Sequence, residues 1–204
     1  MKTNSLNHSP FPTIYLASAS PRRHEILNQI GITHEVLKVP SPPGEDEPQH
    51  EGERAEIYVQ RTALEKAQRA QQFIQTQEMW VRPILAADTA VILDGQVLGK
   101  PNDAFDATKI LSKLSNKVHE VHTAIVLSYR DKVYTDVSIT KVYMRAITMG
   151  DLQMYIESGE YEGKAGAYGI QGLASIFIEK IEGSYSGVMG LPIFETWRLL
   201  KNLH

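Results

Sequence analysis

The sequence contains no cysteine among its 204 residues. This absence excludes disulfide bonds, zinc ribbons, iron–sulfur clusters and thiol nucleophiles in one step. It is typical of proteins that stay in a reducing compartment, and we expect a cytoplasmic location.

Long apolar runs and an excess of positive charge are absent as well. No run approaches the roughly 20 apolar residues that a transmembrane helix needs, and the N-terminal stretch MKTNSLNHSPFPT lacks the apolar core of a signal peptide. Lys and Arg number 21 against 24 Asp and Glu, a formal net charge of −3. We therefore expect neither a membrane nor a nucleic acid as partner, although a basic cluster inside a cleft is compatible with this balance.

The apolar patterns predict an α/β fold in which helices and strands alternate. The predicted elements are a long helix over 55–76, a hairpin of 84–93 and 96–98 turned by Asp94-Gly95, a second hairpin of 121–129 and 133–144, and a later strand over 175–181. Two hairpins exclude a purely parallel sheet, so the sheet is expected to be mixed, with flanking helices.

Polarity suggests the limits of the domain. Residues 1–12 are predicted to be a disordered extension, and 13–204 a single domain. The most polar stretch, PSPPGEDEPQHEGER over 40–54, holds four prolines and five acidic residues and predicts a loop.

The segment LASASPRR places two arginines at the start of a predicted helix that runs to Gln29. Ser20 is a favourable N-cap and Pro21 suits the first turn. Arg22 and Arg23 in that turn oppose the helix dipole unless an anion binds there and takes up the free N–H groups. The alternative is that both arginines are simply solvated.

Asp88 lies inside the apolar segment ILAADTAVIL. A carboxylate in such a strand is costly unless it is paired, liganded or at an exposed end, and many such residues are catalytic. The alternative is an aspartate at a strand bend that bonds its own backbone.

Other polar residues carry weaker signals. Lys66 and Lys100, taken alone, are compatible with solvated surface lysines, and the acidic pair Asp46-Glu47 with a solvated charge run. Glycines in GEYEGKAGAYGIQG permit close approach of a ligand, where Tyr168 would stack on a ring and the Gln171 amide would read a base edge. An irregular connector with a core tyrosine explains the same segment.

Taken together, these segments resemble the Maf family of nucleoside triphosphate pyrophosphatases over about 14–200. The matching segments are LASASPRR (16–23), Asp46-Glu47, LEKA (64–67), AADTAV (86–91), LGKP (98–101), HEVHTA (119–124), KAGAYGIQG (164–172), IEGSY (181–185) and GLP (190–192). Their order and spacing agree throughout, which makes the likeness more specific than any one motif.

The resemblance implies a mixed, twisted sheet with flanking helices and two lobes around a cleft, similar to the inosine-triphosphate pyrophosphatase fold. It also implies a role for each matching residue. Asp88 would be the general base that activates water. The substrate specificity set would be Arg22, Thr89 and Gln171, the phosphate-binding set Ser18, Arg23, Lys66 and Lys100, and the metal ligand Glu47.

The AYGIQG segment is similar to the branch of the family that acts on dTTP and UTP. The resemblance therefore implies hydrolysis of these nucleotides, and of modified pyrimidine nucleotides such as 5-methyl-UTP and pseudo-UTP, to the monophosphate and pyrophosphate. It further implies a divalent cation, Mg²⁺ or Mn²⁺, and a homodimer. The competing hypothesis is a nucleotide-binding regulator of cell division that does not turn over its ligand.

Overall fold

A computed structural model describes residues 9–40 and 48–203 of the chain. The strands form one sheet in the order β2-β1-β3-β5-β6-β7, with β4 paired to β3. The strands are β1 (Ile14–Leu16), β2 (His34–Val36), β3 (Ile84–Leu93), β4 (Gln96–Leu98), β5 (Val118–Tyr129), β6 (Lys132–Met144) and β7 (Ile178–Glu182). β1 runs parallel to β2 and β3 and the remaining pairs are antiparallel, so the predicted mixed sheet is confirmed.

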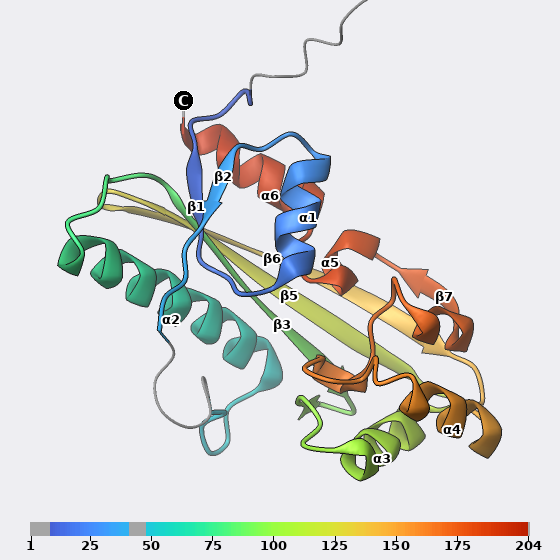
Figure 1. Ribbon diagram of the computed structural model, residues 1–204. Helices are drawn as coiled ribbons and strands as arrows, with labels where there is room; N and C mark the ends of the chain where they lie inside the picture. Colours follow the sequence, from blue (N-terminus) through green and yellow to red (C-terminus); the bar gives the residue numbers. More distant parts are fainter. Residues whose placement is uncertain (1–8, 41–47, 204) are drawn as a thin grey trace, which may run out of the picture.

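Helices cover both faces of this sheet (Figure 1). The helices are α1 (Pro21–Gln29), α2 (Ala55–Thr76), α3 (Ala104–Leu114), α4 (Met149–Glu157), α5 (Tyr185–Met189) and α6 (Ile193–Leu200), with short 3₁₀ turns η1 (Ala165–Ala167), η2 (Leu173–Phe177) and η3 (Lys201–Leu203). α2 lies along one face of the sheet, and α1 and α6 lie along the other. α3 and α4 pack against the open end of the long β5–β6 hairpin, opposite its turn. No helix in the described part of the chain has both the length and the apolarity needed to cross a bilayer.

One edge of β3 is left open in the middle of the strand. β1 pairs with β3 only at Ile84 and Leu85, and β4 pairs with it only from Val91 to Leu93. Between these points no described strand lies on that side of β3, whereas β5 pairs with the other side throughout. Because successive side chains on a strand point to opposite faces, such an opening lets residues from both faces reach one space.

Several predicted elements have the expected bounds. The helix over 55–76 and the strand over 84–93 are confirmed, and the turn after β3 has positive φ at Asp94 (51°) and Gly95 (78°), as a two-residue hairpin turn requires. The β5–β6 turn is one residue shorter than predicted: Tyr129 pairs with Lys132, so the turn consists of Arg130 and Asp131.

The strand predicted over 175–181 is partly wrong. Residues 173–177 form the 3₁₀ turn η2, and the strand begins at Ile178. Ala174 and Phe177 are three residues apart and both buried, a spacing that suits one face of a 3₁₀ turn and not one face of a strand.

Of the extension predicted over 1–12, only the part from Ser9 onward is described. There Phe11 is buried, with its ring edge-on to Trp197 of α6 at 5.0 Å between centroids. Phe11 belongs to the core between the sheet, α1 and α6, so ordered packing begins before residue 13.

A buried polar pair lies in the core beside η1. His119 of β5 is 1% exposed, and its Nε2 lies 2.7 Å from the Tyr168 hydroxyl. The His119 Nδ1 has no hydrogen-bond partner, and burial lowers the pKa of His119 to about 4. The histidine is therefore neutral in the folded protein at neutral pH.

This pair predicts a pH dependence of stability. The pKa of His119 is about 4 in the folded protein and about 6.5, the ordinary value of histidine, in the unfolded chain, so the unfolded chain takes up the proton first as the pH falls. The contribution of His119 to stability is complete above about pH 6.5 and is lost toward pH 4, by at most about 1.4 kcal/mol per pH unit.

We expect His119→Phe to flatten the dependence of the free energy of unfolding on pH between 6.5 and 5. Urea denaturation at several pH values measures it. Parallel curves for the two proteins would contradict this assignment.

Candidate active site

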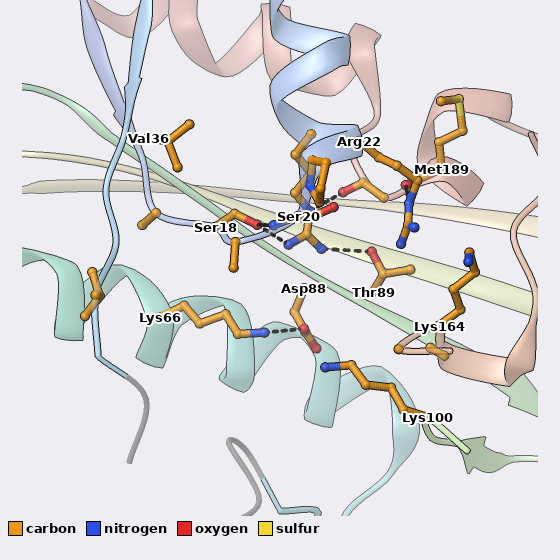
Figure 2. A pocket seen from close by; sticks show the side chains of 18 of the residues that line it. Ser18, Ser20, Arg22, Val36, Lys66, Asp88, Thr89, Lys100, Lys164 and Met189 are labelled. Carbon is orange, nitrogen blue, oxygen red and sulfur yellow. Dashed lines mark hydrogen bonds and ion pairs between the residues drawn. The ribbon is translucent and has the colours of Figure 1, made fainter. Parts of the chain in front are cut away.

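A cavity of about 770 Å³ opens beside the unpaired edge of β3. Its wall combines the β1–α1 loop, the chain after β2, one face of α2, the middle of β3, Lys100 after β4, the segment 162–168 and the end of α5 (Figure 2). A volume of this size suits a small organic ligand such as a nucleotide.

Asp88 is held at the centre of this cavity by two residues of α2. Lys66 Nζ lies 2.6 Å from Asp88 Oδ1, and Thr62 Oγ1 lies 2.7 Å from Asp88 Oδ2. The Asp88 side chain is 13% exposed and that of Lys66 23%. Lys100 points toward the same carboxylate from after β4 (Figure 2). The strand carboxylate is therefore paired, and each of its oxygens keeps a lone pair for a further donor.

Thr89 reaches the cavity from the opposite face of β3 and belongs to a hydrogen-bonded chain. Thr123 Oγ1 donates to Gly187 O at 2.8 Å, so it accepts from Thr89 Oγ1 at 2.9 Å. Thr89 Oγ1 in turn accepts from Arg23 Nη2 at 3.2 Å. This chain joins α1, β3, β5 and α5 around one wall of the cavity.

The β1–α1 loop presents anion-binding groups. Ser18 Oγ accepts from Arg23 Nη1 at 2.9 Å and from Ser20 N at 3.2 Å, which leaves its own hydroxyl proton for another acceptor. Ser20 is the N-cap of α1, but the predicted capping bond is not formed: its side chain makes no cap hydrogen bond. The first turn of α1 therefore has no side-chain cap, and its residues Pro21, Arg22 and Arg23 line the cavity, which is compatible with an anion site.

The lining of the cavity is mixed in chemistry. It includes the cations Lys38, Lys66, Arg69 and Lys100 and the apolar residues Val36, Leu37, Val39 and Met189. The part lined by Val91, Val121, Tyr168 and Val188, which pack in one core cluster, is called the apolar end below. Two further cations, Arg22 and Lys164, stand beside the apolar end (Figure 2). Arg22 Nε donates to Met189 O at 3.4 Å.

The structure brings together most of the residues singled out in the sequence. Ser18, Arg22, Arg23, Lys66, Asp88, Thr89 and Lys100 all line the cavity. Gln171 is exposed and is not among the lining residues, and Glu47 lies outside the described residues. Tyr168 lines the apolar end, but its hydroxyl turns into the core toward His119, as the core interpretation of this residue predicts.

The sequence analysis missed Thr62 and Lys164. Thr62 stands four residues before Lys66, so helical spacing already puts both on one face of α2, where a carboxylate partner could have been sought. Lys164 carried no such signal, since its place depends on how the glycine-rich segment folds.

Carboxylates are sparse around the cavity. The described lining residues include only Asp88 and Glu162 as acids, and residues 9–40 and 48–203 hold no group of three His, Cys, Asp or Glu suited to a metal ion. This donor set does not build an all-protein metal cage. It is compatible with an oxygen-bound ion that takes its other ligands from phosphates and water.

Comparison with known proteins agrees with this geometry. A family model described as "Maf-like protein" matches residues 13–203. The chain belongs to the Maf-like family. A Bordetella pertussis member named "dTTP/UTP pyrophosphatase" is 60% identical over 191 residues, covering 94% of this chain and 92% of that protein.

A more distant Maf-like protein carries the same name. The Methylobacillus flagellatus "dTTP/UTP pyrophosphatase" is 48% identical over 189 residues, covering 93% of this chain and 92% of that protein. The Staphylococcus aureus Ham1 protein is 15% identical and superposes with a TM-score of 0.46 over 65% of this chain and 72% of its own.

Arg22 and Arg23 are adjacent in this Maf-like chain but differ in what they hold together. Arg23 bonds Ser18, Thr89 and Gly190 O, the last at 2.7 Å, whereas Arg22 makes the single longer bond to Met189 O. We expect Arg23→Ala to lower the free energy of unfolding by about 1–3 kcal/mol, because it removes three hydrogen bonds to partly buried groups, including the one to Gly190 O.

Arg22→Ala is the matched control, and its cost is expected to stay under about 1 kcal/mol. Urea denaturation of the two variants measures the difference. Equal losses would contradict the assignment of Arg23 as the residue that joins the loop to β3.

Proposed function

We propose that this protein is a nucleoside triphosphate pyrophosphatase that hydrolyses dTTP and UTP to the monophosphate and pyrophosphate. The observation that carries the proposal is a single cavity whose lining combines several lysines and arginines, an apolar end and a paired carboxylate. A triphosphate suits the cations and a pyrimidine suits the apolar end. The relatives from Bordetella pertussis and Methylobacillus flagellatus, both named "dTTP/UTP pyrophosphatase", support the same substrates.

Asp88 would act as the general base. In this reaction a water oxygen forms a bond to the α-phosphorus, the bond from that phosphorus to the bridging oxygen breaks, and pyrophosphate leaves. Asp88 accepts the proton that the water loses. Lys66 at 2.6 Å pairs with the carboxylate, and the hydrogen bond from Thr62 helps to fix its orientation.

Cationic groups would bind and stabilise the triphosphate. It brings about four negative charges, and phosphoryl transfer is catalysed mainly by positioning and by stabilising charge. Lys66 and Lys100 flank Asp88, and Ser18, which accepts a hydrogen bond from Arg23, lies across from them. Charge developing on the leaving pyrophosphate therefore meets fixed donors.

A divalent cation, Mg²⁺ or Mn²⁺, is proposed to enter with the triphosphate. Asp88 offers an oxygen ligand within the described residues, and Glu47 is the predicted second one. When bound, such an ion offsets charge on the phosphates. The sparse carboxylates around the cavity suit an ion that the nucleotide carries, because Mg²⁺ in such sites is held by one or two carboxylates plus phosphates.

Selectivity for the base is proposed to come from Arg22, Thr89 and Gln171. Arg22 and Thr89 line the cavity, which supports this assignment, while Gln171 is not among the lining residues and lies beside Gly169. Modified pyrimidine nucleotides such as 5-methyl-UTP and pseudo-UTP are included in the proposed range. A homodimer, a cytoplasmic location and the exclusion of nucleic acid remain predictions from resemblance and composition.

The test is pyrophosphate release with Mg²⁺ or Mn²⁺ from dTTP, UTP, CTP, GTP, 7-methyl-GTP and 5-methyl-UTP. We expect dTTP and UTP to lead, and Asp88→Asn to lose at least about 10²-fold in kcat because the base is removed. Asp94→Asn, the same change at an exposed turn residue, is the control and is expected to keep wild-type activity.

Two results would overturn the proposal. Binding of these nucleotides without pyrophosphate release would favour the regulator hypothesis. Full activity of Asp88→Asn would make Asp88 a structural carboxylate that holds α2 against β3.

A further inference from the structure

Lys164 is a cavity residue to which neither the sequence analysis nor the family resemblance assigned a role. It directly precedes η1 and lines the cavity, near Arg22 and Met189 (Figure 2). The apolar residues Val91, Val121, Tyr168 and Val188 pack together in one core cluster below it, and Ala165, the next residue, packs against the same cluster. Lys164 therefore stands at the apolar end, away from Lys66.

The side chain of Lys164 is held in one position. Its Nζ donates to the main-chain oxygen of Glu160, and its stem crosses over Gly169. A Cβ at position 169 would lie 3.1 Å from Lys164 Cε and 3.2 Å from Cδ, so a side chain at this position would crowd the stem and glycine leaves room for it. A tethered lysine of this kind loses little entropy when a ligand binds.

Gln171 contacts the same glycine from another direction. Its Nε2 would lie 3.3 Å from a Cβ at Gly169, next to the Lys164 stem. Of these two side chains, Lys164 lines the cavity and Gln171 does not. Of the two polar side chains that meet at Gly169, Lys164 is therefore the one that reaches the cavity.

The charges around Lys164 favour an electron-rich ligand. Burial first, and then the positive charge of Arg22, lowers the pKa of Lys164 below its usual range, while Glu160 and Glu162 oppose this shift. Its hydrogen bond to Glu160 O uses one of three ammonium protons, so further N–H groups remain for a ligand. A hydrogen-bond acceptor placed between Lys164 and Arg22 would reduce the repulsion between their positive charges.

We propose that Lys164 is a specificity-determining residue whose ammonium donates a hydrogen bond to a ring carbonyl oxygen of the uracil or thymine base, beside Arg22. This inference rests on the proposed function. Thymine presents an acceptor at O4, as uracil does, whereas cytosine presents an N4 amino donor at that position. The N4 amino group of cytosine would face Lys164 and Arg22, which are donors as well, so neither the base nor the protein would find an acceptor there. A site that binds a carbonyl oxygen therefore discriminates against cytosine.

The test compares Lys164→Met with wild type on UTP and CTP. Losing a hydrogen bond from a charged donor is expected to lower kcat/KM for UTP about 10- to 100-fold, mainly through KM. The value for CTP is expected to fall less than about 3-fold, so selectivity drops by at least a few-fold. Lys132→Met, the same change at an exposed lysine of the β5–β6 turn, is the control and should change neither value.

An equal loss on UTP and CTP, or no loss on either, would overturn the proposal. Lys164→Gln tests the same claim if the Met variant does not fold, since it also removes the charge. Wild-type protein that releases no pyrophosphate from any nucleotide would refute the proposed function instead. Calorimetric binding of UMP and CMP to both proteins then decides the role of Lys164, with selective weakening of UMP expected.

Discussion

The unpaired stretch of β3 is the constraint on which the site depends. β1 leaves β3 after Leu85, and β4 joins it only at Val91. In a continuous sheet, the side chains of Asp88 and Thr89 would lie on opposite faces and could not line the same cavity, because neighbouring side chains on a strand point to opposite faces. At an open edge both reach one cavity, Asp88 from the face that α2 covers and Thr89 from the face of α1 and α5.

Each wall of the cavity is fixed by contacts that cross long distances in the sequence. α2 supplies Thr62 and Lys66 to the Asp88 carboxylate, and Arg23 joins the β1–α1 loop to Thr89 and to Gly190. These bonds hold charged groups in place before a ligand arrives. Such preorganisation is what electrostatic catalysis requires, since the donors need not reorganise as charge develops on a phosphate.

Local signals in the sequence predicted much of the fold. Helical spacing set the bounds of α2, and the apolar run with Asp94-Gly95 set those of β3 and its turn. Residues 175–177 were wrongly predicted as strand, because the apolar pair Ile176-Phe177 directly precedes β7 and the local pattern does not mark where the 3₁₀ turn ends. The order of the strands and the short parallel pairing of β1 depend on tertiary packing, which no local pattern encodes.

The same division applies to the site. Asp88 and the two arginines stood out because a carboxylate in an apolar strand and cations at a helix start are costly without a partner. Lys164 did not stand out, because its place follows from the path of its stem over Gly169 and from the tether to Glu160 O. Only the folded glycine-rich segment places that ammonium at the apolar end.

The central claim is that water activated beside Asp88 attacks the α-phosphorus of the nucleotide. Hydrolysis of UTP in ¹⁸O-labelled water, followed by mass spectrometry of both products, tests it most directly. The account predicts one ¹⁸O atom in UMP and none in pyrophosphate. Label in the pyrophosphate would mean attack at the β-phosphorus and would contradict the account.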